Sequence, residues 1–390
     1  MPSKYYELGV DVEKRGIEVF SEILENLFPE AFCVVSRNPH HRKEGIVLHT
    51  DSAGSKPVQA YLQWKETDDP SSFEGLAQDA LAMNIDDIIC VGATPVSFVD
   101  YVALNSKKVG KETLLKALSR GFKGCLKTLG EYGLQISFSG GETADLPDQM
   151  RTLDVSVTAL GYVDLSKVIS GSGIEPGDLI VGLRSGGKTS YERRENSGLM
   201  CNGVTLARHC LMRKEYQDRY PEIAETEGRG YYGRFRIEDY LDELGMTVGE
   251  ALLSPTRLYA PIVMKILEEY REGIHGLIHN TGGGQTKCLR LGRNIHYIKD
   301  RLTQPDPIFR LIKEESGEEW RDMYRDYNMG IGFEVIAAEG VCDDVIGICE
   351  SFKLEAEVIG RCEKSIKGNK LTIVSPYGKF TYPLKNREMC

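Results

Sequence analysis

The chain has 390 residues, of which 41% are hydrophobic and 27% charged, a composition typical of a folded globular protein. This length exceeds what one hydrophobic core usually supports, so we expect two domains. The net charge of −10 argues against a nucleic-acid-binding surface, which needs a basic face. No run of residues is long and apolar enough to predict a membrane span. The start lacks a signal-peptide pattern and the ten cysteines include no Cys-x-x-Cys pair, which predicts reduced thiols in a cytoplasmic protein.

The first part of the chain alternates predicted helices and strands. Apolar residues at helical spacing predict helices over residues 12–28, 72–91 and 113–129, the second capped by Ser71 or Ser72. Short apolar runs predict strands over 32–35, 46–48, 97–104, 134–138 and 153–162. A stretch rich in glycine, serine and proline, 170–178, then predicts a boundary between a domain of residues 1–169 and one of residues 170–390.

The second part continues this alternation. We expect strands over 179–183 and after 327–332, a helix over 204–211, and a hairpin over 371–382. Another helix is predicted to begin at Ser254-Pro255, with Ser254 as its cap, and a glycine turn over 279–284 is expected to open a further helix. Residues 214–241 are charged and rich in tyrosine, and we interpret them as a surface insertion. The pattern as a whole predicts an α/β fold of the α+β type.

One stretch of oxygen-bearing side chains beside two glycines suggests a ligand site. Gly140-Gly141 follows a predicted strand, and adjacent glycines allow positive φ and expose backbone N–H groups to an anion. Glu142 and Asp145 would repel a bare phosphate, but a divalent cation placed between them would bind both kinds of oxygen. The stretch therefore predicts a metal–nucleotide site, while an ordinary turn with solvated acids stays open as the alternative.

Other acids add to this hypothesis. Asp51, Gly54 and Lys56 follow a predicted strand, where they could bind a metal and a phosphate. Asp79, Asp86 and Asp87 lie on the predicted helix over 72–91, where acids more often form a solvated face; the acids at Asp51 and Glu142 strengthen the alternative that they line a site. Asp100 interrupts an apolar strand, so we expect it to point into a polar site.

Taken together and in order, the motifs resemble the aminoimidazole ribonucleotide synthetase family, the phosphoribosylformylglycinamidine cyclo-ligases of purine synthesis. The resemblance covers most of the chain. The matching segments are Tyr5 to Asp11, Thr50-Asp51 with Gly54 and Lys56, Asp87 with Gly92-Ala93 and Pro95, Phe98 with Asp100-Tyr101, Gly140 to Ala144 with Pro147, Asn202-Gly203, Pro255-Thr256-Arg257 with Tyr259, Thr281 to Gly284, and Met323-Tyr324-Arg325 with Asn328, Gly330 and Gly332.

This resemblance implies a homodimer whose N-terminal sheets pair into a barrel, with a C-terminal α/β sandwich domain closing over the ATP site. It implies that ATP phosphorylates the formamide oxygen of a phosphoribosyl substrate, whose own amine then closes the ring. Mg²⁺ would be held by Asp51, Asp87 and Glu142. The nucleotide would contact these three and Gly54, Lys56, Gly140, Gly141 and Thr143, and His279, Asn202 and Asp100 would be candidate catalytic residues.

The sequence also departs from the family pattern. The glycine-rich segment near the first strand is replaced by 32–42, a histidine is missing before Asn202, the asparagine expected after the triple glycine aligns with Cys288, and about a dozen residues are inserted over 188–199. These departures affect substrate-side motifs more than nucleotide-side ones. Two alternatives therefore stay open: an ATP-dependent enzyme that phosphorylates an oxygen of another substrate, and a non-catalytic nucleotide-binding relative.

Overall fold

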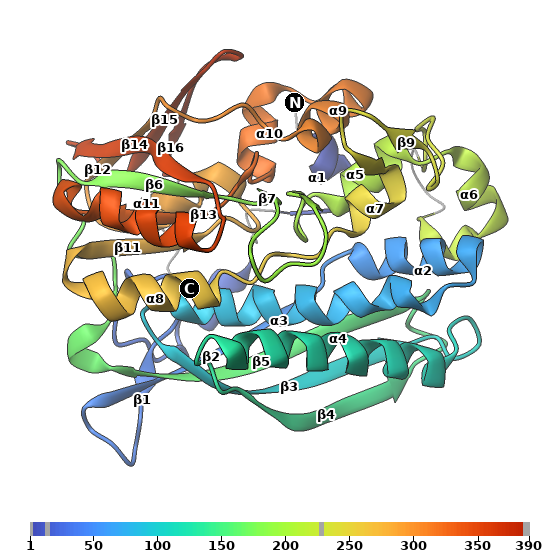
Figure 1. The fold of residues 1–390 in the computed structure, drawn as a ribbon, viewed down its shortest axis with the longest axis horizontal. Coiled ribbons are helices and arrows are strands. Elements are labelled where there is room, and N and C mark those ends of the chain that lie inside the picture. Colours follow the sequence, from blue (N-terminus) through green and yellow to red (C-terminus); the bar gives the residue numbers. More distant parts are fainter. Residues whose placement is uncertain (1–2, 12–15, 226–229, 385–390) are drawn as a thin grey trace.

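The computed structural model describes residues 3–11, 16–225 and 230–384, and its elements form two sheets with helices packed between and around them (Figure 1). The first sheet has five strands in the order β1-β2-β5-β3-β4, in which only β3 and β4 run parallel. Its strands are β1 (Ser36–Arg37), β2 (Glu44–Ser52), β3 (Thr94–Leu104), β4 (Ser137–Asp145) and β5 (Leu153–Asp164). The helices between them are α2 (Lys56–Thr67), α3 (Glu74–Ile89) and α4 (Lys111–Glu131).

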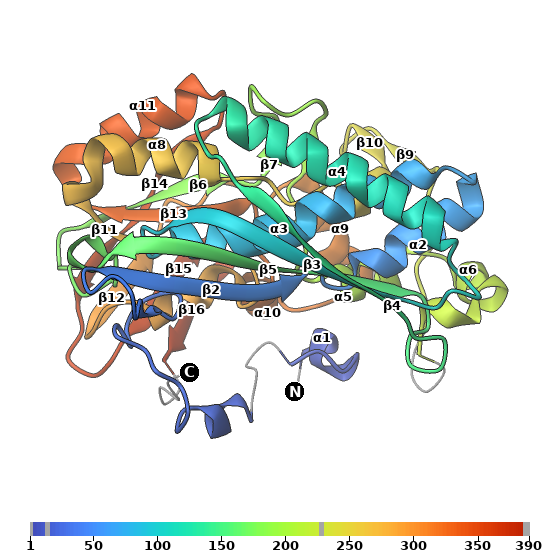
Figure 2. The ribbon, with the colours of Figure 1, turned by 90° about the horizontal axis from the view of Figure 1, so that it is seen from below.

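This first sheet has one covered and one open face. Along β5 the burial alternates strictly: Val155 and Val157 are buried, whereas Ser156 and Thr158 are only partly covered. The buried side faces α3, which packs against β2 and β5, and we call it the helix face. The opposite side, which no helix of the first half covers, is called the open face; Figure 2 shows the strands from that side. Period-two alternation in β5 thus fixes which side chains reach the centre of the molecule.

The second sheet has seven strands in the order β11-β13-β6-β14-β12-β15-β16. They are β6 (Leu179–Arg184), β11 (Ile274–His279), β12 (Ile295–Lys299), β13 (Ile331–Ala337), β14 (Ala356–Lys364), β15 (Lys370–Ser375) and β16 (Gly378–Pro383). Every residue of β13 is buried, as expected of a strand covered on both faces. The helices of this half are α5 (Val204–Leu211), α6 (Lys214–Arg219), α7 (Val248–Leu253), α8 (Ala260–Tyr270), α9 (Pro307–Ser316), α10 (Trp320–Asp326) and α11 (Cys342–Ser351).

Smaller elements complete the chain. The helix α1 (Lys4–Glu7) precedes the first sheet, and two short strand pairs lie in the second half: β7 (Gly186–Gly187) with β8 (Asn196–Ser197), and β9 (Tyr240–Leu241) with β10 (Met246–Thr247). Single turns of 3₁₀ helix are η1 (Ile17–Phe20), η2 (Pro70–Phe73), η3 (Leu165–Lys167), η4 (Pro221–Ile223), η5 (Arg271–Gly273) and η7 (Glu339–Val341), and η6 (Gly284–Arg290) is longer. The predicted insertion over 214–241 contributes α6 and η4, and η4 packs on α2.

Several predicted elements differ from the observed ones. In the helix predicted over 12–28, residues 12–15 lie outside the described part, and the remainder forms only η1, with Val19 and Ile23 exposed and Phe28 partly buried against the core. The strand predicted over 32–35 is displaced to β1, and helix α2 was not predicted at all. Ser71 and Ser72 do not cap α3; instead Asp69 caps the short helix η2 through the N–H of Ser71.

The helix predicted to begin after the cap Ser254 starts five residues later than expected. Ser254 is occupied elsewhere: its Oγ accepts from the N–H of Ser197 and donates to the carbonyl of Glu250, so it does not cap a helix. The chain stays irregular until α8 begins at Ala260. The turn over 279–284 leads into the 3₁₀ helix η6 rather than into an α-helix. The late start of α8 follows from a long-range contact that local sequence does not encode, because Asp86 of α3 accepts from the backbone N of Tyr259 and of Ala260.

Candidate active site

Helix α3 carries three acids from the first half of the chain towards the second. Asp79, Asp86 and Asp87 are at most 5% exposed, so the solvated face that their pattern commonly indicates is not observed. A buried carboxylate destabilises a fold unless hydrogen bonds or opposite charges compensate it. Each of these three is compensated by residues of the second half, and together they hold the two sheets against one helix.

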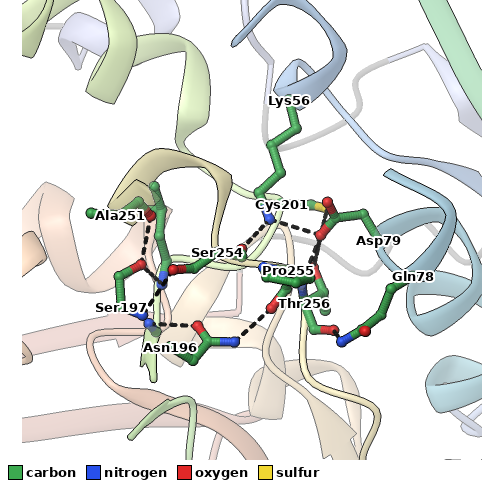
Figure 3. A network of polar contacts seen from close by, with 12 residues as sticks. Lys56, Gln78, Asp79, Asn196, Ser197, Cys201, Ala251, Ser254, Pro255 and Thr256 are labelled. Carbon is green, nitrogen blue, oxygen red and sulfur yellow. Dashed lines mark hydrogen bonds and ion pairs between the residues drawn. The ribbon is translucent and has the colours of Figure 1, made fainter. Parts of the chain in front are cut away.

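Asp79 pairs with Lys56 in a network that joins the two halves (Figure 3). The fully buried Nζ of Lys56 donates to Oδ1 of Asp79 at 2.7 Å and to the carbonyl of Ser254 at 2.5 Å. The same Oδ1 accepts from the backbone N and the Oγ1 of Thr256, and Sγ of Cys201 lies 3.2 Å away. A buried, paired ammonium does not offer the accessible charge that we expected Lys56 to present to a phosphate. The structure departs from that expectation because Asp79 draws the side chain inward.

Asp86 caps a helix from the other half. Its two carboxylate oxygens accept from the backbone N of Tyr259 and of Ala260, both at 2.9 Å, and these are free N–H groups at the start of α8. Burial raises the pKa of Asp86 well above its ordinary value, against the effect of those two hydrogen bonds. Asp86 therefore supplies the cap that local sequence had assigned to Ser254.

Asp87 lies at the centre of a group that we call the Asp87 cluster: His49, Asn84, Asp87, His279 and Lys287. Its Oδ1 lies 2.7 Å from Nδ1 of His279 on β11, and its Oδ2 lies 3.5 Å from Nε2 of His49 on β2 and 4.0 Å from Nζ of Lys287. Burial alone would raise the pKa of Asp87, but Lys287, His279 and His49 outweigh it and bring the pKa below its ordinary value. Asp87 is therefore an anion that can only accept hydrogen bonds.

This anion fixes the tautomer of His279. Burial lowers the pKa of His279 despite the nearby carboxylate, so the ring is neutral near pH 7. A neutral imidazole beside an acceptor places its hydrogen on Nδ1, which leaves a lone pair on Nε2. Nε2 is buried and has no hydrogen-bond partner in the described part of the chain. An oriented, neutral histidine with an unused lone pair is a candidate general base.

Asn202 and Gly54 also lie where the two halves of the chain meet, and we call this region the seam. The Nδ2 of Asn202 is buried without a partner among the described residues, and a Cβ added to Gly282 would lie 3.5 Å from its Oδ1. Gly282 belongs to residues 281–284, which we call the glycine loop. A Cβ on Gly54, whose φ is +60°, would lie 3.0 Å from the carbonyl oxygen of Cys201. The structure thus brings the end of β2, Asn202 and the glycine loop together.

Asp51 and Asp100 lie on one row of the first sheet. Asp51 and Asp100 both pair with Val157, and Asp100 also pairs with Gly141, so these positions share the helix face. Asp51 is partly exposed, and its Oδ1 accepts from the N–H of Ser52. Asp100 is half-buried, which raises its pKa. Because β2 and β4 are three strand spacings apart, about 14 Å separates the two ends of this row.

Gly140 and Gly141 lie within strand β4 rather than in a turn. The register skips a residue between Phe98 and Asp100, and Gly140, with φ of +101°, is part of this bulge. A Cβ on Gly141 would lie 1.7 Å from Oδ1 of Asp100, so only glycine fits there. The second glycine therefore serves close packing against Asp100 in this chain, and the anion-binding turn that we expected is not formed.

Glu142 points away from the other two proposed metal ligands. It pairs with Tyr101, one position after Gly141, so its side chain lies on the open face, whereas Thr143 returns to the helix face. Asp87 reaches the cluster from α3 on the helix face. Within the described residues, no group of three or more His, Cys, Asp or Glu side chains is placed to hold a metal ion. The complete Asp51, Asp87 and Glu142 set therefore does not fit a cation within one chain.

Comparison with known proteins identifies the family. Residues 31–163 match the family "AIR synthase related protein, N-terminal domain", and residues 175–369 match its C-terminal domain. A phosphoribosylformylglycinamidine cyclo-ligase of Methanocaldococcus jannaschii is 35% identical over 330 residues, which span 84% of this chain and 81% of that protein. The chain belongs to the AIR synthase related protein family. A Methanobrevibacter smithii protein of the same name is 31% identical over 94% of this chain and 99% of its own length.

Solved structures of other proteins share the fold at low sequence identity. AaThiL complexed with AMPPCP and TMP superimposes with a TM-score of 0.56 at 14% identity, covering 93% of this chain and 94% of that one. A HypE-HypF complex gives a TM-score of 0.55 at 14% identity, covering 94% of this chain and 98% of that one. The two-domain α/β family fold expected from the sequence is confirmed.

Sequence reasoning missed three members of the Asp87 cluster. His49 lies two residues before Asp51 on the same strand, so period-two alternation alone could have placed both on one face. Asn84 precedes Asp87 by almost one helical turn, and its amide contacts both Nδ1 of His49 and the carbonyl of Asp51. Lys287 carries no such signal, because only the fold brings its Nζ within 4.0 Å of Asp87.

Proposed function

We propose that this chain is an ATP-dependent cyclo-ligase that converts formylglycinamidine ribonucleotide to aminoimidazole ribonucleotide in purine synthesis. Family membership and the two relatives named phosphoribosylformylglycinamidine cyclo-ligase support this proposal, because they align with most of the chain. The product forms by closing a carbon–nitrogen bond at the expense of ATP, which makes the protein a ligase.

The reaction makes modest demands on the protein. The γ-phosphoryl group of ATP moves to the formamide oxygen and leaves ADP behind; the substrate's amine nitrogen then attacks the activated carbon. A C–N bond forms, the C–O bond to the phosphorylated oxygen breaks, phosphate departs, and nitrogen loses a proton. Such steps depend mainly on positioning, charge neutralisation and an acceptor for that proton.

The observation that carries the proposal is the pair formed by Asp87 and His279. Asp87 is held as an anion and keeps the His279 hydrogen on Nδ1, so Nε2 is free to accept the proton released by the attacking amine. Asn202, whose amide nitrogen lacks a partner among the described residues, is proposed to donate to the substrate beside the glycine loop. Asp100 stays a proposal for a weaker role, because its carboxylate is packed against Gly141.

Nucleotide binding is consistent with the family, since a structural neighbour was solved with AMPPCP. We propose that ATP lies along the seam formed by Asp51, Gly54 and the glycine loop. Mg²⁺ commonly binds through one or two carboxylates together with nucleotide phosphates and water. Asp51 is partly exposed and is the carboxylate we propose for this contact, and the ion would otherwise be held by ATP itself.

We further propose that the chain acts as a homodimer whose open faces meet, as the barrel expected from the family requires. Leu48 on β2 is 63% exposed on that face, and Val99 and Tyr101 on β3, on the same face, are 39% and 43% exposed. Apolar side chains gathered on an uncovered sheet face typically mark an interface. Glu142 lies on the same face and would then meet the partner chain.

The domain division at residues 169 and 170 fits the two sheets, and we retain it as a proposal. The nine described cysteines are free and buried, which supports the reducing environment of the cytoplasm as the proposed location. In the described part of the chain, no helix combines the length and apolarity that crossing a membrane requires.

One assay tests the proposed reaction. The protein is incubated with ATP, Mg²⁺ and formylglycinamidine ribonucleotide, and ADP, phosphate and the aminoimidazole product are quantified. We expect the three products in equal amounts, with His279→Gln at the background rate and Arg361→Gln, which changes a partly exposed residue of β14, at the wild-type rate. ADP release with other acceptors only would instead favour phosphorylation of a different substrate. Binding of ATP without turnover would favour a non-catalytic relative.

A further inference from the structure

Both ends of the glycine loop are tied to one buried ion pair. Nζ of Lys299 on β12 lies 2.5 Å from Oε1 of Glu334 on β13, and both side chains are fully buried. The same Oε1 accepts from Nδ2 of Asn280, the residue before the loop, at 2.6 Å. The same Nζ donates to the backbone carbonyl and to Oε1 of Gln285, the residue after the loop, at 2.9 and 3.0 Å. Each end of the loop is thus hydrogen-bonded to one member of the ion pair: Asn280 to Glu334, and Gln285 to Lys299.

Further contacts make these ends rigid. The backbone N of Asn280 donates to the carbonyl of Gly332, and its Nδ2 also donates to the carbonyl of Ile331. Nε2 of Gln285 donates to the carbonyl of Asn328 at 2.5 Å. Asn280 and Gln285 are both almost fully buried. The loop itself is rich in glycine and has little side-chain packing of its own, so its position depends on how its ends are held.

The loop is in direct contact with the Asp87 cluster. Nζ of Lys287 donates to the carbonyl of His279 at 3.0 Å and to Oγ1 of Thr281, the first residue of the loop. It also lies 4.0 Å from Asp87. A shift of the loop would therefore carry Lys287 and the backbone of His279 with it.

Stability alone does not account for a buried ion pair at this place. Well-packed apolar side chains of similar volume commonly stabilise a protein core as well as a buried ion pair does. What apolar side chains cannot do is bind two separate polar segments through directed hydrogen bonds. The pair at Lys299 and Glu334 does this at the two ends of a loop beside the candidate base.

We propose that Lys299 and Glu334 are positioning residues that clamp the two ends of the glycine loop and thereby hold His279 and Lys287 in place against Asp87. Neither residue touches the reacting atoms. Their effect on turnover rests on the proposed function, whereas their effect on the loop does not.

The test replaces the pair without leaving an isolated buried charge. In Lys299→Met/Glu334→Leu the core keeps its volume, and we expect a thermal midpoint close to that of the wild type. Hydrogen exchange of the backbone amides over residues 280–287 is expected to become about tenfold faster, because the loop opens without global unfolding. The kcat is expected to fall by about tenfold to a hundredfold with KM for ATP nearly unchanged, because reacting groups lose their alignment. Arg361→Gln removes the ion pairs of Arg361 on β14 with Asp300 and Glu363, which are partly exposed, and serves as the control.

A second variant keeps the experiment decisive if the double variant does not fold. Gln285→Met leaves the ion pair intact but removes one tie between the pair and the loop, so faster exchange over 280–287 and a lower kcat are again expected. Wild-type exchange in this segment, in either folded variant, would overturn the proposal. Faster exchange in a protein that has no cyclo-ligase activity to lose would leave the clamp in place and refute the proposed function instead.

Discussion

Asp87 and His279 are 192 residues apart in the chain, yet Oδ1 of the first lies 2.7 Å from Nδ1 of the second. The contact crosses from α3 in the first half to β11 in the second. It makes Asp87 a partner of the candidate base, although the sequence assigned Asp87 to a metal ion. These two roles predict different consequences for the same substitution.

Asp87→Asn tests which role holds. An asparagine can donate to Nδ1, which moves the hydrogen of His279 to Nε2 and removes the lone pair that accepts the proton. We expect kcat to fall by about 10² to 10⁴, the range that proton transfer by a positioned side chain contributes, with little change in the dissociation constant for ATP. Steady-state kinetics and calorimetric ATP titration in Mg²⁺ measure the two effects. Loss of Mg²⁺-dependent ATP binding would support the metal role instead.

The pair of Lys56 and Asp79 yields a second prediction. Lys56→Met alone leaves Asp79 buried without its counter-ion, and we expect a loss of about 3–5 kcal/mol of stability. Lys56→Met/Asp79→Leu removes both charges and is expected to recover much of that loss. Denaturant unfolding measures both variants. Because Lys56 is turned inward, the folded double variant should keep the wild-type KM for ATP, and a large rise in that KM would show that Lys56 contacts a phosphate after all.

The sequence predicted those elements whose patterns are local and long. Helix α4, strands β3, β5 and β6, and helix α5 formed close to their expected ranges, because each has a clear apolar period. The failures at residues 12–28 and at Ser254 have another cause. In the first segment, Val19, Phe20 and Ile23 are exposed, so this part of its apolar pattern is not buried within the chain. The cap of α8 comes from Asp86, on a helix more than 170 residues earlier.

The candidate site was predicted only in part, because some of its contacts also depend on distant parts of the chain. Family motifs pointed to Asp51, Asp87, Asn202 and His279, which the fold brings to one seam. They could not show that Lys56 is held by Asp79, because that pairing needs the second half of the chain. Nor could they show that Glu142 lies on the opposite face of the sheet from Asp51, since that depends on the bulge at Gly140.

Gly141→Ala should destabilise the first sheet. Its new Cβ would lie 1.7 Å from Oδ1 of Asp100 and 2.4 Å from the backbone oxygen of the same residue, so strand β4 has to shift. We expect a cost of about 2–3 kcal/mol in denaturant unfolding. Gly124→Ala on the neighbouring helix α4 is the matched control: no atom lies within 4 Å of its added Cβ. That variant should gain about 0.5–1 kcal/mol from helix propensity.

His209 predicts a pH dependence of stability. Burial, with the ring packed on Tyr231, and the nearby charge of Arg208 lower the pKa of His209 to about 4, and the hydrogen bond from its Nδ1 to the carbonyl of Gly230 opposes this shift without cancelling it. The unfolded chain binds a proton near pH 6.5, so below that pH protonation favours the unfolded state. Stability is therefore complete above pH 6.5 and falls as the pH drops towards 4, by about 2 kcal/mol between pH 7 and pH 5 from this group.

His209→Gln isolates that effect. Glutamine can donate to the same carbonyl but does not titrate, so the variant's loss of stability between pH 7 and pH 5 should be smaller than that of the wild type by about 2 kcal/mol. Urea unfolding at the two pH values gives the difference directly. Equal slopes for the two proteins would mean that His209 is protonated in the folded state as readily as in the unfolded chain.

Leu48→Asp tests the proposed dimer through the open face. Leu48 is 63% exposed in one chain and therefore contributes little to the folding of that chain, whereas in a dimer formed through this face its apolar surface would be buried. A carboxylate in that position would have to be desolvated on association, so we expect a dimer for the wild type and a folded monomer for the variant. Light scattering after size-exclusion chromatography measures the mass. Ile366→Asp, at a position that is 99% exposed near the end of β14, is the control and should remain dimeric. A dimer that persists in Leu48→Asp would place the interface on another surface of the molecule.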